Sequence, residues 1–420
     1  MGTAPELTAE ELEAMNEHAN TATWWGPLTE VKADYGNGIY IYFKYVWYLM
    51  LFNAVLSVPA LVTFIGAAGS GLDDSTYSGL GLLAISAFPD SVTGLWYAMT
   101  SIGALLALAS PFVYRWYQSR IEAAWKGAER TEETAEGEDI IEENRDATSS
   151  ERRSRRTVSM MVFLVILVGQ GILTYYLQLA LVSASSSVVA LALSGMLAIL
   201  NMVWKKISKT LTKYETHRTK REYTEWDTSK VFILKIGSVL SLYITKSLLG
   251  ADRADSSDCL PADVDCGCPL EDQGQQFFFL IITEIVVGNI MELGVPILRV
   301  WFRTRKSLTS GGGDEDDKDN FDLADEFTEL FYRQFIVLLG MVVFPLMAPL
   351  GAASLALEYA LDKYRLLHFC KKPLVKPDPV RSRLILGCQL AVSVIVLLSY
   401  PNGVVFIFSG LNLGDCRFLN

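Results

Sequence analysis

Histidine and cysteine are scarce in this sequence, with three and six residues among 420. The histidines are His18, His217 and His368, and they lie far apart. No glycine-rich phosphate loop is present, and no Ser or Cys stands in a motif with a base. Because nucleophilic and acid–base catalysis need such groups together, we expect no enzyme.

An excess of positive charge is also missing, since the formal net charge is −11. A protein that binds nucleic acid usually carries a basic face, so we expect no nucleic-acid partner. The segment Met1–Asn37 is polar and acidic and lacks the apolar region of a signal peptide. We therefore expect no cleavable signal.

Long apolar runs, in contrast, are abundant: 51% of the residues are hydrophobic and the mean hydropathy is +0.27. Crossing a bilayer takes roughly 20 apolar residues in a helix. Lipid offers no partner to a free backbone N–H or C=O, so the spans must be helices. We predict an all-α, polytopic membrane helix bundle of about 9–10 transmembrane helices. The runs are Ile39–Gly66, Ser91–Val113, Val158–Val182, Val188–Trp204, Val231–Gly250, Phe277–Trp301, Phe331–Met347, Gly351–Leu367 and Leu384–Ser399.

Lys and Arg alternate between the two sides of this predicted bundle. They gather in the connections after the second, fourth and eighth runs. The connections Ala67–Pro89 and Ser183–Ser187 contain none, and Ala251–Gln276 contains only Arg253. Since basic loops stay in the cytosol, the N-terminus is predicted to be cytosolic. We expect a multi-pass protein, in the plasma membrane.

Two polar connections within the predicted transmembrane domain have too few apolar residues to fold alone. We expect disordered cytosolic loops near 127–156 and 306–320, read as solvated linkers rather than calcium sensors. The basic run Arg145–Arg156 suits anionic headgroups of the lipid bilayer. The predicted domains are a cytosolic acidic segment (1–37), a transmembrane domain (38–411) and an extracellular tail (412–420).

Four cysteines fall on the predicted outside: Cys259, Cys266, Cys268 and Cys416. Oxidation is permitted there, and no histidine is near to complete a zinc site. We expect a disulfide among these four, with the pairing left open.

Glu284 is the most prominent ionisable residue within a predicted span, in the run FFFLIITEIVVGNIMEL. Charged groups at membrane depth usually face a partner or a wet cavity. A buried pair with Lys246 of the preceding run is one interpretation. A carboxylate facing a pore is the other, and it would favour inorganic cations. We favour the pore.

Carboxylates from three predicted helices form a second candidate site. Together they could supply the six to eight oxygens that Ca²⁺ takes, although we expect no cofactor to be required. In the alternative interpretation, the first acids favour a helix start and the later ones pair with Lys363 or Arg365. The candidate ligands are Glu292, Glu326, Glu329, Glu358 and Asp362.

Several stretches resemble the transmembrane channel-like (TMC) family, within the wider superfamily that includes the anoctamins and OSCA channels. The strongest is Asn320–Arg383, with its FD opening, Y-x-Q pair and C-x-x-P segment. CPLEDQGQQ at Cys268–Gln276 resembles the family's C-W-E-T-x-V-G-Q-E motif, and Tyr35–Asn53 resembles the start of its first helix. Leu211–Phe232 is similar to both TMC proteins and anoctamins.

The resemblance implies a homodimer, with accessory membrane subunits, in which each subunit has a cation path lined by its fourth to seventh helices. Glu284 falls at a pore Asp, Gln276 at the motif Glu and Asp322 at the Asp of the FD opening. Asn289 lies along the same path. Pro269 and Gln276 depart from the family motif, and the chain ends before the family's tenth helix, as in a short or truncated member.

The first functional hypothesis is therefore a cation-permeable, TMC-like ion channel, with mechanosensitive opening implied by the resemblance alone. The alternative is an anoctamin-like, Ca²⁺-regulated lipid scramblase or ion channel. It rests on the patterns Glu326-x-x-Glu329 and Glu358-x-x-x-Asp362, although Gly288 stands where an Asn ligand is expected. A non-conducting scaffold is a third hypothesis.

Overall fold

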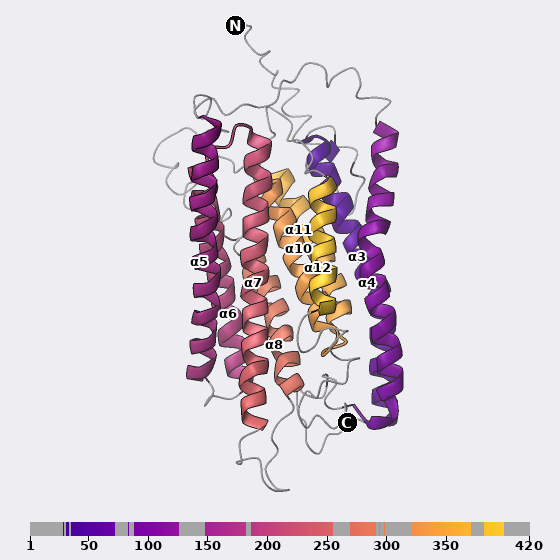
Figure 1. The fold of residues 1–420 in the computed structure, drawn as a ribbon. Helices are drawn as coiled ribbons and strands as arrows, with labels where there is room; N and C mark the ends of the chain where they lie inside the picture. Colours follow the sequence, from indigo (N-terminus) through magenta and orange to yellow (C-terminus); the bar gives the residue numbers. More distant parts are fainter. Residues whose placement is uncertain are drawn as a thin grey trace, which may run out of the picture.

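Every element among the residues that the structure describes is a helix, and the helices form one bundle (Figure 1). The computed structural model describes residues 28, 31–32, 35–71, 83, 88–125, 148–181, 186–254, 269–290, 294, 298, 321–370 and 382–398. The α-helices are α3 (Asn37–Ser70), α4 (Thr93–Trp125), α5 (Ser149–Leu181), α6 (Ser186–Tyr214), α7 (Lys220–Ala254), α8 (Pro269–Thr283), α10 (Leu323–Gly340), α11 (Met347–Phe369) and α12 (Ser382–Leu398). A 3₁₀ turn, η3 (Asp90–Val92), precedes α4, and a π-helical segment, η6 (Glu284–Gly288), continues α8.

Five of these helices are long and apolar enough to cross a membrane by length and composition: Asn37–Ser70, Thr93–Arg120, Ser149–Leu179, Leu191–Tyr214 and Glu222–Thr245. Gly274–Gly288 and Leu384–Leu398 are shorter apolar helices beside them. The predicted all-helical, polytopic fold is therefore confirmed.

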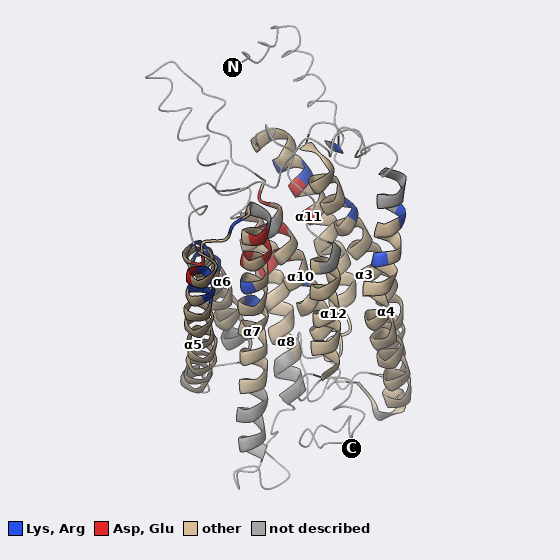
Figure 2. Ribbon diagram, turned by 45° about the horizontal axis from the view of Figure 1, so that its top comes forward, with Lys and Arg blue, Asp and Glu red and all other residues tan. Residues whose placement is uncertain are grey.

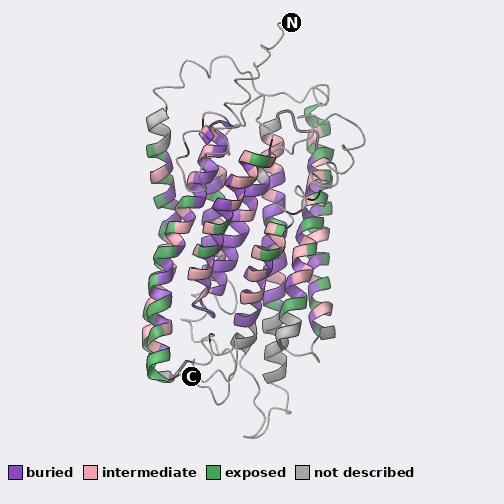
Figure 3. Ribbon diagram, turned by 180° about the vertical axis from the view of Figure 1, so that it is seen from behind, coloured by how far each residue is buried: buried purple, intermediate pink, exposed green. Residues whose placement is uncertain are grey.

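Apolar side chains are exposed on the outer helices and buried in the centre (Figure 3). On α5, Met161, Val165 and Tyr176 are each more than 60% exposed. A water-soluble protein rarely leaves so much continuous apolar surface uncovered. Such a surface fits a helix that faces lipid.

Helix α10 lies at the centre of the bundle and packs against α3, α7, α8, α11 and α12. Its residues from Leu330 to Leu339 are all buried, on every side of the helix. Gln334 makes two amide hydrogen bonds with Asn53 of α3, at 2.7 and 3.3 Å. Where α10 meets α11, Gly351 leaves room for Val337, because a Cβ there would lie 2.6 Å from Val337 Cγ2.

Charged residues gather at one end of the bundle (Figure 2), which is called the charged end below. Helices α5, α7 and α10 begin at this end, and α6 and α11 finish there. The last turns of the connection that was expected to be disordered near 127–156 are helical, since α5 starts at Ser149. Glu151 and Arg155 form an i,i+4 ion pair there, which supports the helix.

The seventh predicted run also differs from the structure. It was expected at Phe331–Met347, but α10 begins eight residues earlier, at Leu323, and ends at Gly340. The first turn contains Asp325 and Glu326, which favour a helix N-terminus. A hydropathy criterion leaves these acids out of the predicted span. In the structure they belong to the helix, and basic residues of neighbouring helices pair with them.

Candidate functional site

Helices α10 and α11 each present two acids and one arginine on a single face. On α10, Glu326, Glu329 and Arg333 follow spacings of three and four residues. On α11, the set Glu358, Asp362 and Arg365 follows spacings of four and three. Residues at these spacings lie on one side of a helix. Because the two helices run in opposite directions, the arginine of each meets an acid of the other.

Arg333 of α10 and Glu358 of α11 form the inner ion pair. Arg333 Nη1 donates to Glu358 Oε2 at 2.7 Å, and the side chains are 3% and 2% exposed. Arg365 of α11 forms the outer pair by donating to Glu326 Oε1. Arg365 Nη2 also lies 3.7 Å from Asp362 Oδ1, and the hydroxyl of Tyr42 donates to Asp362 Oδ2. Arg365 therefore balances the negative charge of carboxylates on both helices, and Arg333 that of a carboxylate on the facing helix.

Lysines of α6 and α7 complete the set. Lys235 Nζ lies 3.8 Å from Glu329 Oε1, and Lys205 Nζ lies 4.0 Å from the same oxygen. Lys205 is also 3.0 Å from Asp325. We call the following eight residues the acid–base cluster: Lys205, Lys235, Glu326, Glu329, Arg333, Glu358, Asp362 and Arg365. It joins four helices near the charged end of the bundle.

Glu284 comes within electrostatic range of this cluster. It opens the π-helical segment η6, is partly buried, and is attracted by Lys235 and Arg333 while Glu329 and Glu358 repel it. The side chain of Lys246, its alternative sequence-predicted partner, lies outside the described residues. Single π-turns within α-helices are frequent at functional sites. The two sites expected from the sequence, the Glu284 pore residue and the carboxylate group, are thus neighbours.

The other predicted pore residues lie further apart. Gln276 is buried on α8 and borders a small apolar pocket with Tyr243 and Phe277, and its Nε2 has no hydrogen-bond partner among the described residues. Asn289 follows η6 and donates to the backbone oxygen of Ile285. Their role as pore residues stays a prediction.

Asp322 precedes α10 at the charged end and is exposed, 3.2 Å from Lys209 Nζ. Partial desolvation by the surrounding helices acts to raise the pKa of Asp322, but the ammonium of Lys209 outweighs it, so the pKa is lowered below its ordinary value. Lys209 is also 3.0 Å from Asp325. Asp322 therefore belongs to a surface ion-pair network in this structure, and a pore role for it also stays a prediction.

The four described carboxylates of the predicted Ca²⁺ site face basic side chains in this structure. Ca²⁺ takes six to eight oxygen ligands. Each of Glu326, Glu329, Glu358 and Asp362 instead has a basic neighbour, and Glu326 Oε2 is the one carboxylate oxygen of this cluster that is buried without a hydrogen-bond partner. Among the described residues, no three acidic, histidine or cysteine side chains converge on a metal position. Glu292, the fifth predicted ligand, lies outside the described residues.

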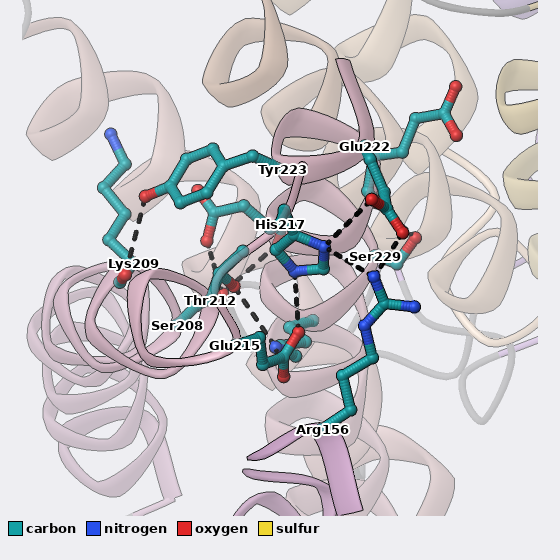
Figure 4. Close-up of polar contacts among 12 residues, drawn as sticks. Arg156, Ser208, Lys209, Thr212, Glu215, His217, Glu222, Tyr223 and Ser229 are labelled. Carbon is teal, nitrogen blue, oxygen red and sulfur yellow. Dashed lines mark hydrogen bonds and ion pairs between the residues drawn. The ribbon is translucent and has the colours of Figure 1, made fainter. Parts of the chain in front are cut away.

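A second polar cluster closes the tight connection between α6 and α7 at the charged end (Figure 4). His217 is fully buried between Arg156 of α5 and Glu215. Arg156 Nη2 lies 3.3 Å from His217 Nδ1, and His217 Nε2 lies 2.8 Å from Glu215 Oε2. An arginine can only donate, so Nδ1 accepts and the proton of the neutral ring sits on Nε2. This arrangement fixes the tautomer and joins α5 to the α6–α7 connection.

Lys230 of α7 also holds the connection between α6 and α7. It is buried, donates to Glu215 and lies 3.2 Å from Thr212 Oγ1. Burial raises the pKa of Glu215, but hydrogen bonds from His217 and Lys230 outweigh it, so the pKa is lowered from its ordinary value of 4.5. Thr216, next to it, has a φ of 52°, an uncommon left-handed conformation for a β-branched residue. These contacts hold a strained, tight turn in place.

All four cysteines expected to form a disulfide, Cys259, Cys266, Cys268 and Cys416, lie outside the described residues. The described cysteines, Cys370 and Cys388, are both buried.

Arg333 is the residue of this site that sequence reasoning missed. It stands in FYRQF, within an apolar run, four residues after Glu329. An arginine in such a run is itself a signal, because a charge at membrane depth needs a partner. The pairing of Asp362 with Arg365 was among the expected alternatives; that of Glu358 with Arg333 was not.

The family model described as "Anoctamin: Calcium-activated chloride channel" matches residues 31–400 of the chain. Among curated proteins, anoctamin-4 of Bos taurus and of Homo sapiens are each 24% identical over 202 residues, which cover 42% of this chain and 21% of theirs. Human anoctamin-3 is 25% identical over 200 residues, covering 42% and 20%. The chain thus spans about a fifth of the length of these relatives. The matches do not support the narrower TMC membership expected from the motifs.

Proposed function

Because this chain belongs to the anoctamin family, we propose that it moves ions across a membrane along a polar seam between α6, α7, α8 and α10. The observation that carries the proposal is the position of Glu284 within electrostatic range of Lys235 and the rest of the acid–base cluster, inside a largely apolar bundle. Ionisable groups at membrane depth are costly and usually mark ion pathways.

The seam contains charged side chains of both signs, and these affect which ions the path would conduct. Glu284 would favour cations, whereas Lys235, whose ammonium lies 5.3 Å from the centre of the Tyr332 ring, would favour anions. The family match supports the anoctamin-like alternative over the mechanosensitive, TMC-like cation channel that was expected first. Selectivity therefore depends on which of these two side chains faces the moving ion.

The orientation in the membrane is part of the proposal. The charged end contains the basic side chains of α5 and α6, including Arg155, Lys205 and Lys209. Basic residues stay on the cytosolic side, so we place this end, and the start of α3, in the cytosol of a plasma-membrane protein. Homodimer formation and accessory membrane subunits stay predictions from the resemblance.

Lipid scrambling is the second candidate function, and one observation favours it. In η6 and the residues after it, Glu284 and Asn289 are partly buried, while Val286 and Ile290 are 48% and 60% exposed. The polar face of this segment therefore adjoins an apolar face that would meet lipid. A polar seam open to lipid could pass a headgroup while the acyl chains stay outside.

Purified protein in liposomes tests both candidates. Ion flux and dithionite-accessible lipid flipping are measured on the same preparation, for the wild type and for Glu284→Gln and Lys235→Gln. We expect transport in the wild type and a change in its rate or ion selectivity in both variants. Glu151→Gln, in an exposed pair on α5, is the matched control and should behave as the wild type. Flux without flipping supports the channel, and flipping supports the scramblase. Unchanged transport in both seam variants would remove Glu284 and Lys235 from the path.

A further inference from the structure

We infer that the basic residues of the acid–base cluster occupy the place that a calcium ion would take between α10 and α11, so that this protein does not use calcium there. The inference concerns the same site as the proposed function. Its binding part stands alone, and only its consequence for transport rests on that proposed function.

The first step is the charge count. The cluster has four acids, Glu326, Glu329, Glu358 and Asp362, and four bases, Lys205, Lys235, Arg333 and Arg365. Each acid lies within 4.0 Å of at least one base, although Lys205 is shared with Asp325. A group of carboxylates binds a divalent cation because its net charge is strongly negative. In this group each of the four carboxylates already has a basic side chain of the same chain as its neighbour.

The second step is the geometry of the two arginines. Arg333 and Arg365 project from opposite helices, and each ends on a carboxylate of the facing helix. The Arg365 guanidinium therefore lies between Glu326 and Asp362, and the Arg333 guanidinium covers Glu358, so the arginines occupy carboxylate oxygens that a bound cation would need. Arg333 is buried at 3% side-chain exposure, and Arg365 is largely buried at 11%.

The third step is the cost of exchange. Calcium would have to break both interhelical pairs and leave two guanidinium groups buried without counter-charges. Removing one partner of a buried pair is strongly destabilising, because the other charge is left uncompensated. At the position facing the cluster on the α8–η6 helix, Gly288 supplies no side-chain oxygen. The four acids have the sequence spacing of a calcium site, but in this structure they form ion pairs with basic residues of the same chain.

Thermal unfolding of the full chain in detergent tests this inference without a transport assay. The protein is freed of calcium with EGTA and titrated with CaCl₂, with MgCl₂ as the reference. We expect the unfolding midpoint of the wild type to stay unchanged at millimolar free calcium. Arg333→Gln and Arg365→Gln should unfold at lower temperature in EGTA and regain several degrees with CaCl₂ but not with MgCl₂. Arg155→Gln, from the exposed pair on α5, should show neither effect.

A calcium-dependent rise in the wild-type midpoint that Glu326→Gln or Asp362→Asn abolishes would overturn the inference. A wild type and arginine variants that are all insensitive to calcium would overturn the role given to the arginines. If both arginine variants fail to fold, the wild-type titration alone decides the question. If the proposed function is wrong and this inference is right, transport is absent while the unfolding midpoints respond to calcium as expected above.

Discussion

Arg333 of α10 and Glu358 of α11 lie 2.7 Å apart in the centre of the bundle, and neither side chain is more than 3% exposed. The pair joins α10, the central helix that contacts α3, α7, α8, α11 and α12, to α11, the next helix in the chain. Together with the reciprocal pair of Arg365 and Glu326, it makes the interface between α10 and α11 electrostatic at its charged end. The same interface is apolar and close-packed at Gly351.

Removing the charge of Arg333 should destabilise the fold strongly. In Arg333→Gln, Glu358 stays buried without its counter-charge, which costs about 3–5 kcal/mol. Arg333→Lys should lose less, because it keeps the charge. Arg155→Gln, which breaks an exposed pair, should cost about 1 kcal/mol or less. Unfolding midpoints in detergent compare the three, and equal losses in Arg333→Gln and Arg155→Gln would contradict the buried pair.

A side chain at position 351 should force α10 and α11 apart. The Cβ of Gly351→Ala would lie 2.6 Å from Val337 Cγ2, and the β-branched valine has little freedom to move away. Overpacking of this kind costs about 1–3 kcal/mol. The double variant Gly351→Ala with Val337→Ala should recover part of the loss in unfolding midpoint.

Gly387→Ala on α12 is the matched control, because no atom lies within 4 Å of its added Cβ. A Gly-to-Ala change in a helix should be neutral or slightly stabilising there. If both glycine variants unfold at the wild-type temperature, the close approach of α10 and α11 at Gly351 is wrong.

Acid should weaken the α6–α7 connection through Glu215. The pKa of this carboxyl is lowered by His217 and Lys230 despite its burial, so its stabilising contribution is complete above its ordinary value of 4.5. It is lost as the pH falls from there through the lowered folded-state pKa. The difference in unfolding midpoint between the wild type and Glu215→Gln should therefore be constant near neutral pH and shrink below about pH 4.5. A difference that grows on acidification would contradict the lowered pKa.

Sequence reasoning reached the fold class because the apolar runs are long and the basic connections alternate. It placed α10 too late, since hydropathy treats Asp325 and Glu326 as connection residues. Their helix depends on Lys209 and Arg365, which come from distant parts of the chain. Periodicity carries no information about such pairings.

The candidate site was predicted in part for the same reason. The acids of α10 and α11 stand out in the sequence, and so does Glu284. Their pairings between helices do not, because Arg333 reaches Glu358 across 25 positions and Lys235 reaches Glu329 across a helix interface. The ion pairs of these carboxylates become apparent only from the packing of the helices.

Transport by wild-type protein in EGTA-treated liposomes, with ion flux and lipid flipping recorded on one preparation, tests the account most directly. We predict ion flux, or flipping, that persists when calcium is chelated and that changes in Glu284→Gln but not in Glu151→Gln. Transport that stops when calcium is chelated, or liposomes that show neither flux nor flipping in either condition, would contradict the account.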